Sequence, residues 1–129
     1  MIAYLDTSAA MKLVVEEAES TALLGLLTSA EEFDLVASWL LHTELHCAAN
    51  RHPDSVPTAA VEQVLDTVTL VDLTRGDLLT AGTLPGGLRS ADALHLAVAL
   101  RVAADDMVTY DAELAAAARS AGLRVRDPR

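Results

Sequence analysis

The stretch IAYLDTSAAMKLVV, residues 2–15, begins with four apolar residues and continues with an acid, two hydroxyl residues and a helical pattern. The apolar run 2–5 predicts a buried strand, and the apolar spacing over 8–15 predicts a helix directly after it. Asp6 stands at the junction, where an aspartate commonly caps a helix. A buried strand that passes straight into a helix is typical of an α/β fold with a parallel sheet.

The same alternation of short apolar runs and helical patterns continues along the chain. Further strands are predicted at 34–37, 68–73, 107–110 and 123–126, and further helices at 20–30, 39–51, 57–67, 75–82, 90–104 and 112–121. We therefore expect residues 1–129 to form a single α/β domain with three α/β/α layers. Its central, mainly parallel sheet should have about five strands.

The composition limits the classes of function. The chain carries 19 acidic residues against nine basic ones, and its net charge is −10. This balance argues against a passive nucleic-acid coat, which needs a basic surface, but allows an enzyme that reaches phosphates through bound cations. Cys47 is the only cysteine, and no apolar run approaches the length of about 18 residues that spans a membrane. With no signal-peptide pattern either, we expect a cytoplasmic protein without a membrane span.

Two aspartates follow predicted strands directly. Asp6 comes after the run 2–5 and Asp111 after the run 107–110, and each precedes a predicted helix. Ligands of open α/β sheets bind outside the carboxyl ends of the strands, so both carboxylates can point into one crevice. When each aspartate is considered alone, the preferred interpretation is that it is the N-cap of the helix that follows.

Glu44 interrupts the apolar face of the predicted helix 39–51. Its helical neighbours at three and four residues are Leu40, Leu41, Cys47 and Ala48. Burial of an unpaired carboxylate costs several kcal/mol or forces it neutral. We therefore expect a partner or a ligand for this carboxylate, although a surface position would also explain it.

His42 and His46 offer a rival metal site on that helix. They are four residues apart and share a helix face, which suits zinc. The zinc metalloprotease motif places Glu directly after the first His, and HTELH does not. Glu44 lies about 200° around the helix from each histidine. We therefore interpret the pair as part of an exposed polar face.

Asp92 belongs to the predicted helix 90–104, which is apolar over most of its length. Ser90 is expected to cap this helix, so that Asp92 lies in the first turn, where a carboxylate suits the helix dipole. His95 lies one turn further on, and we interpret it as a packed, hydrogen-bonded residue rather than a ligand. If the acids converge, their repulsion raises their pKa values or destabilises the fold unless cations bind. Carboxylate oxygens suit Mg²⁺ or Mn²⁺, which activate water and clamp a phosphodiester.

Four pieces of the sequence carry a resemblance: YLDTSAAMKLVVEE, HTELHCA, LRSADALHLAVAL and VTYDAELAAAARSAGLRV. In this order and at these spacings, from Ile2 to about Arg126, the chain resembles the PIN-domain ribonucleases, specifically the VapC-type toxins of type II toxin–antitoxin pairs. The resemblance implies a Mg²⁺- or Mn²⁺-dependent endoribonuclease that hydrolyses RNA, binds a VapB-type antitoxin and forms a homodimer. Cys47 departs from the pattern, because many relatives carry a basic residue there, and this puts an RNA contact on that helix in doubt.

Residue by residue, the resemblance implies an acidic site at which metal binding and catalysis coincide. The acids that match are Asp6, Glu44, Asp92 and Asp111. The hydroxyl residues beside them, which would orient carboxylates or bound waters, are Thr7, Ser8, Thr43 and Thr109. Lys12 and Glu17 match positions that relatives often fill alike, and we expect them as secondary members of the site.

Two other functions remain open. An aspartyl-phosphate phosphatase or a phosphoacceptor domain would use Asp6 as its nucleophile. The phosphatase normally has a second Asp two residues later, where this chain has Ser8. A non-catalytic binding module would have kept only a partner surface, and the retention of all four acids argues against it.

Overall fold

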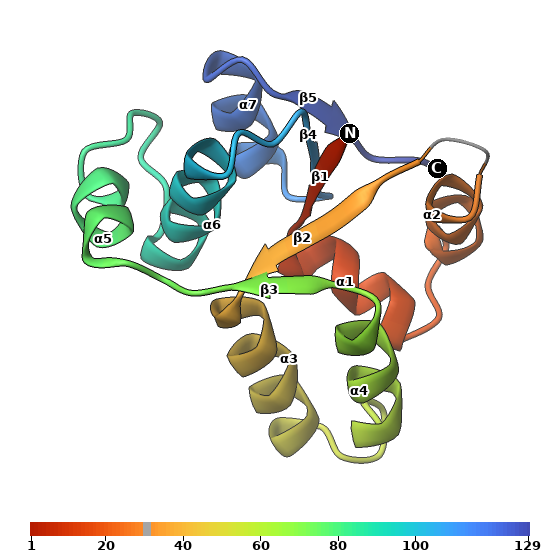
Figure 1. Cartoon of the computed structure of the whole chain (residues 1–129). Helices are drawn as coiled ribbons and strands as arrows, with labels where there is room; N and C mark the ends of the chain where they lie inside the picture. The colour runs from red at the N-terminus through yellow and green to blue at the C-terminus, as the bar shows by residue number, and fades with distance from the viewer. Residues whose placement is uncertain (30–31) are drawn as a thin grey trace.

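A computed structural model describes residues 1–29 and 32–129 of the chain (Figure 1). Its sheet contains β1 Ile2–Leu5, β2 Asp34–Ser38, β3 Thr69–Val71, β4 Asp106–Val108 and β5 Arg124–Arg126. The strand order is β3-β2-β1-β4-β5, and every neighbouring pair is parallel. The predicted α/β class with a central parallel sheet is confirmed.

Helices cover both faces of this sheet. The described helices are α1 Thr7–Val14, α2 Ser20–Leu27, α3 Trp39–Arg51, α4 Thr58–Asp66, α5 Arg75–Ala81, α6 Ser90–Arg101 and α7 Ala112–Ser120. Figure 1 shows α1, α3 and α4 on one side of the sheet and α6 and α7 on the other, with α5 packed outside α6. The three-layer prediction is therefore confirmed. None of the described helices is both long and apolar enough to cross a membrane.

The predicted elements are found, and several of them have shorter ends than expected. The helix expected over 20–30 ends at Leu27, and residue 30 lies outside the described residues. The helix expected over 90–104 ends at Arg101, because Ala103 adopts a left-handed φ of 56° that leaves the helical path. Of the strand expected over 68–73, only residues 69–71 form β3.

Side-chain caps fix where several helices begin. Asp6, Ser38 and Asp111 cap α1, α3 and α7, and each accepts a hydrogen bond from a backbone N–H of the first turn. Thr74 and Asp77 form a reciprocal capping box at the start of α5. All four of these helices therefore begin at the same edge of the sheet, with no more than three residues between the end of a strand and the start of the helix.

The expected cap at Ser90 is wrong. Helix α6 begins at Ser90 itself, and Arg89 occupies the N-cap position without a side-chain capping hydrogen bond. The reason is that the Arg89 carbonyl already accepts from the N–H of Ala93 at 2.9 Å, which starts the helix one residue earlier. Asp92 still lies in the first turn, as predicted.

The core is built from small and aliphatic residues around the two central strands. Ala3, Tyr4 and Leu5 of β1 are fully buried, and so is Met107 of β4. Both faces of these strands are covered by helices, which explains why they read as continuous apolar runs rather than alternating ones.

One buried acid lies at the opposite edge of the sheet from the strand ends that carry Asp6 and Asp111. Asp106 begins β4 and is 1% exposed. Arg124 contacts both of its carboxylate oxygens at 2.9 Å, and Arg126 Nε contacts Oδ2 at 3.1 Å. This charge cluster ties β4 to β5 at the point where both strands begin.

We expect Asp106→Ala to lower the free energy of unfolding by about 3 kcal/mol, because it removes the buried partner of two guanidinium groups. Urea denaturation measures the change. Asp54→Asn is the control, since Asp54 is exposed in a loop and should shift stability by less than about 0.5 kcal/mol. Equal stability of the two variants would show that the cluster contributes nothing.

Candidate active site

Two aspartates leave the central strands at the same edge of the sheet. Leu5 of β1 pairs with Val108 of β4, and the N–H of Asp6 donates to the Val108 carbonyl at 3.0 Å. Asp6 is 2% exposed and follows β1, whereas Asp111 follows β4 after a short link. Both residues are N-caps, so the capping interpretation is confirmed for each. The cap leaves part of each carboxylate available for a second role.

Two hydroxyl groups hold Asp6 in place. The Ser8 and Thr109 hydroxyls donate to Asp6 Oδ2 at 2.7 and 2.9 Å. Ser8 Oγ in turn accepts from the N–H of Tyr110 at 2.9 Å, and Thr109 Oγ1 accepts from the N–H of Asp111 at 3.1 Å. These bonds link the ends of β1 and β4 and fix the direction of the Asp6 carboxylate.

Glu44 reaches the same edge from helix α3. Its Oε1 accepts from the Thr7 hydroxyl at 2.8 Å and lies 2.6 Å from His95 Nε2. Burial by itself raises the pKa of Glu44, but the hydrogen bond from His95, the charge of that ring when it is protonated, and the Thr7 hydroxyl together outweigh burial and lower the pKa. The carboxylate that interrupts the apolar face is therefore held ionised by neighbours from α1 and α6.

The pKa of Asp92 is shifted by the charges of the other three acids. Burial, followed by the charges of Asp6 and Asp111 and a smaller contribution from Glu44, raises the pKa of Asp92 to about 6, against a partial offset from His95. Burial is the largest cause of the shift, and the contributions of Asp6 and Asp111 come from carboxylates close enough to Asp92 to act through their charge. Among the described residues, none donates a hydrogen bond to the Asp92 side chain.

Each of these acids keeps at least one carboxylate oxygen without a protein donor. Asp6 and Glu44 use only Oδ2 and Oε1, and Asp111 uses only Oδ1, which caps α7. Within the described ranges no buried side-chain polar atom lacks a partner, so the unused oxygens are accessible to solvent. Such a set of oxygens fits a hard divalent cation such as Mg²⁺ or Mn²⁺.

The four acids lie at the same edge of the sheet, but they are not close enough together to coordinate one ion. Over the residues that the structure describes, no three His, Cys, Asp or Glu side chains stand close enough to hold one ion. Repulsion between uncompensated carboxylates favours this spacing. A cation would therefore have to draw the free oxygens inward.

The remaining predicted site residues lie apart from the acids. Thr43 is exposed on α3, and in the described part of the chain it makes no hydrogen bond to them. Lys12 pairs with Glu17 at 2.6 Å and with Glu19 at 2.9 Å, and it lies over the Tyr110 ring. Among the described residues, no hydrogen bond or ion pair links Lys12 or Glu17 to the four acids, so their role as secondary members of the site stays a prediction.

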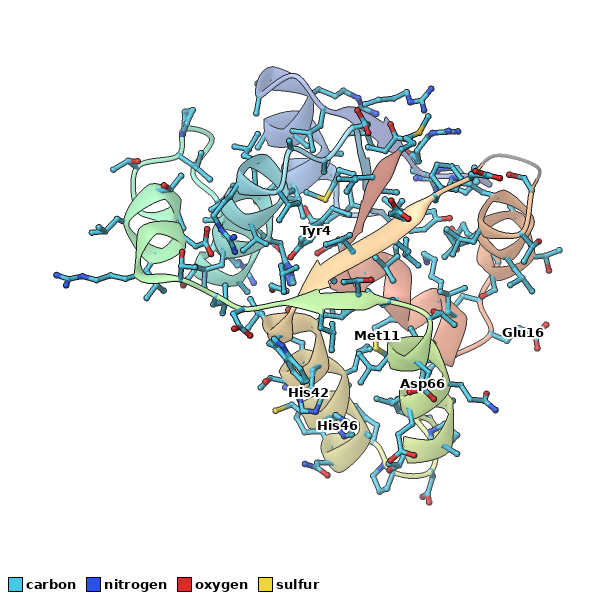
Figure 2. All side chains as sticks on the ribbon, in the orientation of Figure 1. Tyr4, Met11, Glu16, His42, His46 and Asp66 are labelled. Atoms are coloured by element: carbon cyan, nitrogen blue, oxygen red, sulfur yellow. The ribbon has the colours of Figure 1, made fainter. Side chains whose placement is uncertain are left out.

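The rival histidine pair lies on another side of α3. The rings of His42 and His46 are 4.5 Å apart, and His42 also packs against Trp39, which is 46% exposed (Figure 2). Among the described residues, the hydrogen-bond partners of Glu44 are Thr7 and His95, and neither His42 nor His46 is one of them. Both histidines are half-buried rather than exposed, so the predicted exposed polar face is confirmed only in part.

Comparison with known proteins covers the part of the chain that contains these acids. The PIN domain family model matches residues 3–120, a range that contains all four acids. Ribonuclease VapC47 of Mycobacterium tuberculosis is 35% identical, over 97% of this chain and 96% of that protein. Ribonuclease VapC46 of the same species is 36% identical over the same shares.

Solved structures share the fold at lower identity. A VapBC2 complex from Rickettsia felis bound to a promoter DNA fragment has a TM-score of 0.72, with 17% identity over 100% of both chains. VapC20 of Mycobacterium tuberculosis, described as a Sarcin-Ricin loop cleaving toxin, has a TM-score of 0.70 and 16% identity over 94% of this chain and 95% of that one. Since the family model and the curated relatives extend through the acidic edge of the sheet, this chain belongs to the PIN domain family, as a relative of the VapC proteins.

Proposed function

We propose that this protein is the toxin of a VapBC-type pair, a divalent-metal-dependent endoribonuclease that hydrolyses RNA phosphodiester bonds. The observation that carries the proposal is the set of free carboxylate oxygens at one sheet edge, together with the raised pKa of Asp92. Curated relatives at 35–36% identity that bear the name ribonuclease support the same reaction.

We propose that Asp6, Glu44, Asp92 and Asp111 hold the cation, which is Mg²⁺ or Mn²⁺. Bound there, such an ion lowers the pKa of a water and offsets the charge that develops on the phosphate. The protein contributes orientation: Ser8 and Thr109 fix Asp6, and Thr7 fixes Glu44. The cation also favours the ionised form of Asp92, whose pKa of about 6 leaves it partly protonated near neutrality.

The partners follow from this role. A VapB-type antitoxin is the proposed inhibitor, since similar solved structures include toxin–antitoxin complexes from Klebsiella pneumoniae and Haemophilus influenzae. RNA is the proposed substrate, and a homodimer is the proposed assembly. An enzyme that acts on RNA under the control of an antitoxin would work in the cytoplasm.

The phosphatase alternative receives no support from the site. Ser8, which occupies the position of the second phosphatase aspartate, donates its hydroxyl to Asp6 Oδ2. An aspartyl nucleophile needs a carboxylate oxygen and a nearby acid to protonate the leaving group. The acids near Asp6 instead add negative charge to its surroundings, which suits a cation better than a phosphoryl group.

We expect RNA cleavage by the purified protein to need added Mn²⁺ or Mg²⁺ and to stop in EDTA, because the four acids cannot activate water without a cation. Gel analysis of a labelled RNA with and without EDTA, followed by addition of excess Mn²⁺, measures this dependence. Recovery of cleavage with Mn²⁺ excludes damage by the chelator. Cleavage that continues undiminished in EDTA would overturn the metal-dependent reaction.

A further inference from the structure

A chain of buried hydrogen bonds runs from the sheet to Glu44. The N–H of Ser38 donates to the Tyr4 hydroxyl at 3.1 Å, and this hydroxyl lies 2.7 Å from His95 Nδ1. The other ring nitrogen, His95 Nε2, lies 2.6 Å from Glu44 Oε1. Tyr4 points from β1 into the layer between the sheet and α6 (Figure 2). Tyr4 and His95 are both fully buried.

For a neutral His95 ring, the donors and acceptors of this chain favour one tautomer. The Tyr4 oxygen accepts from the N–H of Ser38, and the hydroxyl hydrogen can point at His95 Nδ1. Nδ1 then accepts, so the ring proton sits on Nε2 and is donated to Glu44 Oε1. This assignment leaves no buried donor unused.

Glu44 depends on this support more than the aspartates do. Its longer side chain has more rotatable bonds, and ordering them costs more conformational entropy. Thr7 and His95 both contact Oε1, so together they hold this oxygen from two directions and leave Oε2 free. Thr7 alone would hold one oxygen and permit the group to rotate about it.

We propose that His95, oriented by Tyr4, is a positioning residue that holds the Glu44 carboxylate so that Oε2 faces the cation. This inference rests on the proposed function, because it assumes that Glu44 is a metal ligand. His95 does not contact the metal or the RNA, and acts only through Glu44. Partners of this kind typically change metal affinity by 10–100-fold.

Binding of Mn²⁺ without RNA tests the proposal. His95→Leu removes the donor to Glu44 and should weaken Mn²⁺ binding about tenfold, measured by electron paramagnetic resonance of free Mn²⁺. His95→Gln retains an N–H donor and should recover part of the affinity. Val98→Ala is the matched control, because Val98 is fully buried on the same helix and no hydrogen bond links its side chain to Glu44. It should bind Mn²⁺ within about twofold of the wild type while losing stability.

The tautomer gives a second measurement that needs no variant to fold. Nitrogen-15 NMR of the wild-type imidazole should show an unprotonated Nδ1 and a protonated Nε2 for His95. A protonated Nδ1 would overturn the assignment, and so would equal Mn²⁺ affinity of wild type and His95→Leu. A wild type that binds Mn²⁺ without cleaving RNA would instead contradict the proposed function. In that case the affinity ratio still decides whether His95 positions Glu44.

Discussion

Asp6→Asn should lower Mn²⁺-dependent RNA cleavage by about 100-fold or more, at a metal concentration that saturates the wild type. Loss of a residue that merely orients a ligand costs 10–100-fold, and loss of a ligand should cost at least as much. The substitution removes the negative charge but keeps the size of the side chain. Initial rates on a labelled RNA, measured across a Mn²⁺ titration, give the change.

The fold should survive this substitution. The Asn side-chain oxygen can still accept from Ser8 and Thr109, and Asn is as good an N-cap as Asp for α1. The unfolding temperature should therefore remain within a few degrees of the wild-type value. Loss of activity would then report the missing charge and not a damaged sheet.

Asp66→Asn provides the matched control for charge removal. Asp66 is exposed at the end of α4 (Figure 2), and its substitution by Asn changes the net charge by the same amount. It should cleave RNA at the wild-type rate. If Asp6→Asn instead loses much stability and keeps its activity, Asp6 serves only as the cap of α1.

The sequence predicts the sheet well because its strands are covered on both faces. Runs such as 2–5 stay apolar along their whole length, and turn or cap residues separate them from the helices. Ends are less predictable, since they depend on which backbone groups pair. The start of α6 shows this, because Arg89 rather than Ser90 takes the N-cap position.

The acids could be found because each breaks a local pattern. Asp6 and Asp111 follow strands, and Glu44 interrupts an apolar helix face. Their partners could not be found in this way. Tyr4 and His95 are 91 residues apart, and a single bond between two buried side chains leaves no periodic trace in the sequence. Whether all four acids bind a cation stays a prediction.

Asp92→Asn should stabilise the metal-free protein at pH 7.5 and leave it unchanged near pH 4. Because the pKa of Asp92 is raised from 3.8 to about 6 in the folded state, the unfolded chain loses this proton first as the pH rises. The free energy of unfolding therefore falls between about pH 4 and pH 6, and the penalty is complete above pH 6. Partial exposure of Asp92 screens the effect to about 1 kcal/mol.

The Asp92→Asn substitution also has an opposing, destabilising effect, which a substitution at a second acid measures separately. Asn in the first turn of α6 loses a favourable interaction with the helix dipole, worth about 0.5 kcal/mol. Glu113→Gln removes an exposed acid from the first turn of α7 and should show this loss alone. If Asp92→Asn destabilises the metal-free protein at pH 7.5 as much as Glu113→Gln does, Asp92 serves only to start its helix.

Added Mn²⁺ should reverse the order of stability at pH 7.5. A ligand that binds only the folded state stabilises it in proportion to its affinity, and the wild type should bind Mn²⁺ more tightly than Asp92→Asn. The carboxylates whose mutual repulsion destabilises the metal-free protein therefore attract the cation when it is present. Urea denaturation of both proteins, with and without Mn²⁺, measures this crossing. Parallel shifts in the two proteins would mean that Mn²⁺ binds without Asp92.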